Sequence, residues 1–159
     1  MNTRQTRQQG VALIEFALVL PLLLILTLIT TEFGRALYQY NTLTKSVRDA
    51  VRYLSTQDPT ILTSDPGKVT NAKNLVVYGS FANTGTPLAI GLSTAQVPNP
   101  TWQVVVGSPT INTVTIKVAG CANSLPPCYK FIPLISNLFG TAFGNINYGD
   151  ISATMRSPS

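Results

Sequence analysis

Residues 8–16, with the sequence QQGVALIEF, open the apolar run that decides the fold of this chain. The run covers residues 11–29, nineteen positions in which Glu15 is the single ionisable side chain. At ~1.5 Å per residue, a helix of this length crosses a bilayer core of ~30 Å. We therefore expect residues 11–31 to form a transmembrane segment, preceded by a basic leader at residues 1–10.

A carboxylate within a membrane span costs a few kcal/mol or more and usually has a function. Glu15 lies five residues after Gly10. Removal of the leader after Gly10 would create a positive amine at Val11, close to the position of Glu15 in a neighbouring, axially shifted helix. We therefore expect Val11 and Glu15 to pair between subunits. Pro21 removes a backbone donor in mid-span, and we expect a bend there.

An ordinary secretory signal does not explain this N-terminus, because the run is too long and no Ala-x-Ala site follows it. An uncleaved signal anchor remains open. Arg4 and Arg7 favour a cytoplasmic N-terminus, although basic residues soon after the span dilute that bias.

A periodic stripe predicts that the helix continues beyond the membrane. Its members recur at alternating spacings of four and three: Phe33, Leu37, Tyr40, Thr44, Val47, Val51 and Leu54. Asp58-Pro59 ends the pattern. One helix over residues ~12–56 follows, about 65 Å long. We expect its extramembrane part, residues 32–57, to pack on the chain's own domain rather than to form a coiled-coil seam.

Residues 58–159 predict a small α+β domain, rich in short β-branched runs. Strands are expected at residues 103–106, 114–118 and 151–155, the first two as an antiparallel hairpin. A short helix at residues 69–73 should lead into residues 75–78. The fold class is therefore α+β: a long N-terminal transmembrane helix that continues into a domain with an antiparallel sheet.

Two further segments of this domain have less regular patterns. Residues 79–100 predict a long surface connection. Residues 131–143 form an apolar segment, broken at Pro133 and Gly140, that we expect to cover one face of the sheet. The alternative is that this segment lies against the membrane surface.

Composition argues against catalysis and against metal or nucleic-acid binding. The chain has no histidine, and its scattered positive charges (net +5) form no basic stripe. The spacing of Cys121 and Cys128 matches no zinc ligand pair, and no second pair exists. A disulfide between them is expected if the domain lies outside the cytoplasm; two free thiols are the alternative. We expect a non-enzymatic protein without cofactor or metal.

The glycine, the following apolar run and Glu15 resemble the class III signal of type IV pilin-like proteins, which a prepilin peptidase cuts after the glycine. With Glu32-Phe-Gly-Arg35 at the far end, the stretch is similar to the TadE-like family of the tight-adherence (Flp) pilus system. Shorter similarities occur later in the chain, at residues 74–79, 114–118, 129–135 and 151–156.

The resemblance implies a pilin-like α+β fold and a minor pilin of the bacterial inner membrane, with its domain in the periplasm. Cleavage would occur between Gly10 and Val11. The implied partners are the prepilin peptidase, other pilin-like subunits, the inner-membrane assembly platform and the lipid bilayer. Two alternatives stay open: an uncleaved, anchored periplasmic binding module, and a pseudopilin of type II secretion.

Overall fold

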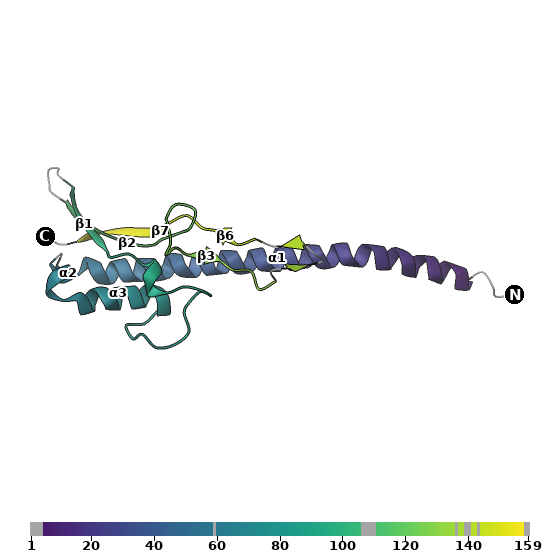
Figure 1. The fold of residues 1–159 in the computed structure, drawn as a ribbon, viewed down its shortest axis with the longest axis horizontal. Coiled ribbons are helices and arrows are strands. Elements are labelled where there is room, and N and C mark those ends of the chain that lie inside the picture. Colours follow the sequence, from purple (N-terminus) through teal and green to yellow (C-terminus); the bar gives the residue numbers. More distant parts are fainter. Residues whose placement is uncertain are drawn as a thin grey trace.

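The computed structural model describes residues 5–58, 60–105, 111–135, 137–138, 141–142 and 144–157. One long helix projects from a small domain that packs along its C-terminal half (Figure 1). The domain contains an antiparallel three-stranded sheet. The α+β class predicted from the sequence is therefore confirmed.

Helix α1 spans Gln5–Ser55 and continues through Pro21. It begins earlier than the predicted start near residue 12, since the leader contains no helix-breaking proline before Gly10. Among the described residues, α1 alone is long and apolar enough to cross a membrane. Its N-terminal half is exposed in the isolated chain, which leaves its apolar side chains available to lipid or to other helices.

The face of α1 that packs on the domain differs from the predicted stripe in its first half. Phe33, Leu37 and Tyr40 are exposed, so the stripe is not buried at these positions, although the Tyr40 ring still contacts the Tyr148 ring of the domain, with ring centroids 5.7 Å apart. The buried positions are Ala36, Gln39, Leu43, Ser46, Val47, Ala50, Val51 and Leu54. The predicted stripe repeats every 3.5 residues, and such a line drifts by ~20° per heptad around a straight helix. Over three heptads the drift carries its start away from the buried face.

The main sheet has the order β1-β2-β7, with β1 at Thr101–Val105, β2 at Ile111–Val118 and β7 at Ile151–Ser157. Both neighbouring pairs are antiparallel, and Val114 lies between Trp102 and Met155. The predicted strands and hairpin are confirmed for the described residues, whereas residues 106–110, which include the end of the first predicted strand, lie outside them. Alternate residues of β2 are buried, namely Val114, Ile116 and Val118, and this face packs towards α1.

Two shorter helices, α2 (Ile61–Ser64) and α3 (Pro66–Tyr78), follow α1. Helix α3 lies on the side of α1 opposite the sheet, so that α1 forms the middle layer (Figure 1). Residues 75–78, expected to follow a short helix, are instead its last turn, which ends at Gly79 in the left-handed conformation (φ 70°). The connection at residues 79–100 contains one short 3-10 helix, η1 (Thr94–Gln96).

The described residues of the apolar segment after the disulfide loop do not form a helix. The segment contains short strands paired as β3 with β6 and as β4 with β5: Lys130–Phe131, Ile146–Asn147, Asn137–Leu138 and Thr141–Ala142. Figure 1 shows β3 and β6 beside α1, beyond the main sheet and towards the N-terminus. The predicted role of covering the sheet is therefore wrong. Pro133 cannot donate to a helical backbone, and the described residues dock on α1 instead.

Candidate functional site

The residues predicted to act in cleavage and assembly all lie on the N-terminal half of α1. Gly10 and Val11 are consecutive helical residues, and a Cβ added at Gly10 would have no atom within 4 Å. Glu15 is exposed, so the domain of this chain does not cover its carboxylate. It lies four residues after Val11 and shares a helix face with it. Pro21 lies inside the same helix.

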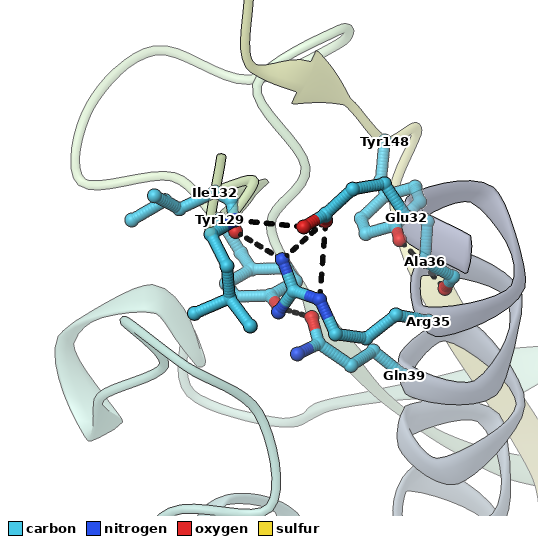
Figure 2. Close-up of polar contacts among 8 residues, drawn as sticks. Glu32, Arg35, Ala36, Gln39, Tyr129, Ile132 and Tyr148 are labelled. Carbon is cyan, nitrogen blue, oxygen red and sulfur yellow. Dashed lines mark hydrogen bonds and ion pairs between the residues drawn. The ribbon is translucent and has the colours of Figure 1, made fainter. Parts of the chain in front are cut away.

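The C-terminal end of the apolar run carries a group of polar contacts that ties α1 to the domain (Figure 2). Arg35 Nη2 donates to Glu32 Oε2 at 2.7 Å and to the backbone oxygen of Ile132 at 2.8 Å. The backbone N–H of Leu134 donates to Glu32 Oε1 at 3.2 Å. The Arg35 guanidinium also lies 4.4 Å from the centre of the Phe131 ring. We call Glu32 and Arg35 the docking pair.

The docking pair is largely shielded from water, since each side chain is only 20% exposed. Ion pairs in such positions are stabilising only when hydrogen bonds satisfy the remaining polar atoms. Here the backbone of residues 132–134 supplies part of that hydrogen bonding, while the buried Arg35 Nη1 has no partner among the described residues. The pair therefore recognises a segment about a hundred residues away in sequence, and it does so mainly through backbone atoms.

Two tyrosines extend the contacts one helical turn further along α1. The Tyr129 hydroxyl donates to Gln39 Oε1 at 3.0 Å, and the Tyr148 hydroxyl donates to the backbone oxygen of Ala36 at 2.8 Å (Figure 2). Their rings stack with centroids 5.9 Å apart. Burial, together with the nearby Tyr148 phenol, raises the pKa of Tyr129 to about 12. Burial raises the pKa of Tyr148 as well, so both hydroxyls stay protonated donors at neutral pH.

A disulfide links Cys121 and Cys128, with their Cα atoms 5.0 Å apart, as the sequence predicted. The closed loop is anchored to the tyrosine positions through its backbone. The Cys121 N–H donates to the Tyr129 carbonyl at 3.1 Å, and the Ala122 N–H donates to the Tyr148 carbonyl at 3.0 Å. The disulfide thus holds the chain at the point where it turns towards α1.

Asp150 binds the disulfide loop through its carboxylate. Its carboxylate accepts hydrogen bonds from Lys117 Nζ at 2.6 Å, Ser124 Oγ at 2.9 Å and the Gly120 N–H at 3.0 Å. The hydrogen bond from Lys117 is the main cause that lowers the pKa of Asp150 below its usual value. Asp150 therefore connects β2, the disulfide loop and the start of β7 in its ionised form.

The described residues contain no group of three or more His, Cys, Asp or Glu side chains that could hold a metal ion. The polar contacts near the end of the span connect protein segments to each other. Their chemistry is that of docking.

The sequence analysis used Glu32 and Arg35 only as part of the stretch that resembles a known family, and it missed that the two side chains bind each other. Their i,i+3 spacing with opposite charge was a usable signal. Gln39, Tyr129 and Tyr148 were also missed. No local pattern could have shown that these side chains meet, because their partners are 90 or more residues apart.

A family model described as TadE-like protein matches residues 10–52 of the chain. The resemblance stated from the sequence is thereby confirmed for the N-terminal third, which includes Gly10, Glu15 and the docking pair. The matched residues cover the apolar run and the first part of its extramembrane continuation. No curated protein and no solved structure matches the chain.

Proposed function

We propose that this chain is a minor pilin-like subunit in the biogenesis of a tight-adherence pilus, inserted in the membrane by α1. The observation that carries the proposal is the TadE-like match over residues 10–52, which covers the apolar span and its extramembrane continuation. The exposed, apolar N-terminal half of α1 supports it, since this surface suits a bilayer or a bundle of sister helices.

In this proposal a prepilin peptidase removes residues 1–10 and leaves a protonated amine at Val11. The Glu15 carboxylate of a neighbouring subunit forms an ion pair with that amine when the two helices are shifted along their axes by about one turn, or ~6 Å. An unpaired carboxylate in hydrocarbon is unfavourable, so the pair penalises other axial positions. The helix thus fixes the axial position of the subunit relative to its neighbours, and the domain lies outside the cytoplasm.

The domain would lie in the periplasm, where a disulfide such as Cys121–Cys128 persists. Partners in this proposal are the peptidase, pilin-like subunits that bind α1, and the inner-membrane assembly platform. The docking pair keeps the domain close to the end of the span, so that the position of α1 in an assembly also sets the position of the domain.

The intact mass of the membrane-extracted protein, with and without the cognate prepilin peptidase, tests the first step. We expect loss of residues 1–10 only when the peptidase is present. An unchanged precursor mass in both strains would contradict the proposal and favour an uncleaved, anchored binding module.

Glu15→Leu tests the assembly step. We expect normal insertion and cleavage but strongly reduced incorporation into pili, because the Val11 amine loses its partner. Thr27→Leu is the matched control: it also replaces a polar group in the span, but the Thr27 hydroxyl only bonds carbonyls of its own helix. Normal piliation by the Glu15→Leu variant would overturn the pairing mechanism.

A further inference from the structure

An apolar patch lies on the domain where α1 leaves the apolar run, and we call it the exit patch. It consists of Phe33 on α1 and of Ile132, Leu134, Ile135 and Ile146 on the docked segment, a name we give to residues 130–135 and 144–147. Four of these side chains are 40% exposed or more, and Leu134 reaches 69%. So many large apolar groups on one small surface indicate a contact with something other than water.

The exit patch borders an open cavity of about 170 Å³. Leu28 and Ile29, the last residues of the apolar run, form one wall. The opposite wall belongs to the docked segment: Phe131, Pro133, Ile135, Gly144 and Ile146. The docked segment therefore lies beside the last turn of the span, and not above it.

The length of the span then places the patch relative to the bilayer. Residues 11–29 extend over roughly 28 Å as a helix, close to the ~30 Å thickness of the hydrocarbon core. No spare apolar length remains that could lift Leu28 and Ile29 into water. Any segment packed beside these two residues must therefore lie at the boundary between acyl chains and headgroups.

Two backbone polar groups of the docked segment already have hydrogen-bond partners, as the boundary between acyl chains and headgroups requires. The Ile132 carbonyl and the Leu134 N–H are both bonded to the docking pair, whose opposite charges neutralise each other. Bonded backbone groups avoid the penalty that free ones incur near hydrocarbon. Lys130, which is exposed and directly precedes Phe131, suits anionic headgroups.

We propose that the exit patch inserts into the outer leaflet of the same bilayer that α1 spans, with an acyl chain of a lipid in the cavity. Continuity with the span identifies the occupant as lipid. The contact gives the domain a second attachment beside the helix and fixes its height above the membrane. Neither leader cleavage nor pilus assembly is needed for it.

Tryptophan fluorescence in nanodiscs that hold one full-length chain each tests this contact. Trp102→Phe provides a background without tryptophan. The buried Trp102 Nε1 has no hydrogen-bond partner among the described residues, so its removal leaves no group unpaired. Leu134→Trp and Ile146→Trp then report on two parts of the exit patch, in lipids with and without brominated acyl chains.

Val104→Trp is the matched control, because Val104 is 63% exposed but lies at the far end of the domain. Its strand partner Asn112 pairs with Ser157, which bonds to Ser55 at the end of α1. Ser55 is 26 residues beyond Ile29, or ~39 Å along the helix.

We expect brominated lipids to quench the Leu134→Trp and Ile146→Trp emission at least twofold and to leave Val104→Trp unchanged. Equal, weak quenching at all three positions would overturn the proposal. So would a blue-shifted, unquenched emission that appears only in discs with two copies, since a second chain would then cover the patch. The uncleaved precursor serves in every arm, so failure here is distinct from failure of the proposed function.

Discussion

Replacing Arg35 by methionine should release the docked segment from α1 while the main sheet stays folded. The substitution keeps an unbranched apolar stem but removes the guanidinium. It thereby removes the hydrogen bonds to Glu32 and to the Ile132 carbonyl and the contact with the Phe131 ring. Glu32 is left without its cation in a site where its side chain is only 20% exposed.

The size of the effect follows from these contacts. A hydrogen bond to a charged group contributes roughly 1.5–3 kcal/mol. A cation–π contact contributes about 0.5–2 kcal/mol, depending on its exposure. Since such contributions overlap, we expect a local loss of about 2–4 kcal/mol in the free energy of docking. At about 1.4 kcal/mol per tenfold change, amides of the docked segment should exchange roughly 30- to 1,000-fold faster.

Hydrogen exchange of the full-length chain in nanodiscs measures this effect at the Leu134 amide, which is bonded to Glu32. Lys68→Met is the matched control, because the Lys68–Asp65 pair is long (3.9 Å) and its side chains are 42% and 49% exposed. An exposed pair of this kind contributes at most about 1 kcal/mol, so exchange at Leu134 should not change. A Leu134 rate within twofold of the unmodified chain in Arg35→Met would refute the docking role.

Three further perturbations test the domain. Gly120→Ala should destabilise it by at least about 1–3 kcal/mol, because the added Cβ would collide with backbone carbonyls of residues 148 and 149. The control is Gly34→Ala, which lies in open space on a helix and should be neutral or stabilising by up to ~1 kcal/mol. Thermal unfolding of the two variants measures the difference. Asp150→Asn should cost about 1 kcal/mol at neutral pH, after allowing for solvent screening. Because the pKa of Asp150 is lowered in the folded state, its contribution is present above the ordinary value of 3.8 and is lost as pH falls below it, so urea titrations of the variant should show a weaker decline in acid than the unmodified chain. Reduction of the Cys121–Cys128 disulfide should lower the unfolding free energy by about 2–3 kcal/mol, as the loop model predicts for a ring this small, and an unchanged melting curve in reductant would contradict that estimate.

The sequence alone was sufficient to predict those elements that depend only on residues close to each other in the chain. The apolar run predicted the projecting helix, since its length and its lack of charge depend only on neighbouring residues. Short β-branched runs located β1, β2 and β7 within a few residues, and the hairpin followed from the order of the first two. The Cys121–Cys128 disulfide, expected from the sequence for a domain outside the cytoplasm, is also formed.

The tertiary structure decided which face of α1 is buried and where the segment after the disulfide loop lies. The sequence contains Glu32, Gln39 and Tyr129 without any sign that they belong to one site. Their meeting depends on how the sheet and the disulfide loop direct the chain back along α1 over 90 or more residues. Periodicity reports only on contacts within one element, whereas docking energy arises between elements whose separation in sequence leaves no pattern. For that reason the projecting half of α1 could be predicted from residues 11–29 alone, and the contacts beside its end could not.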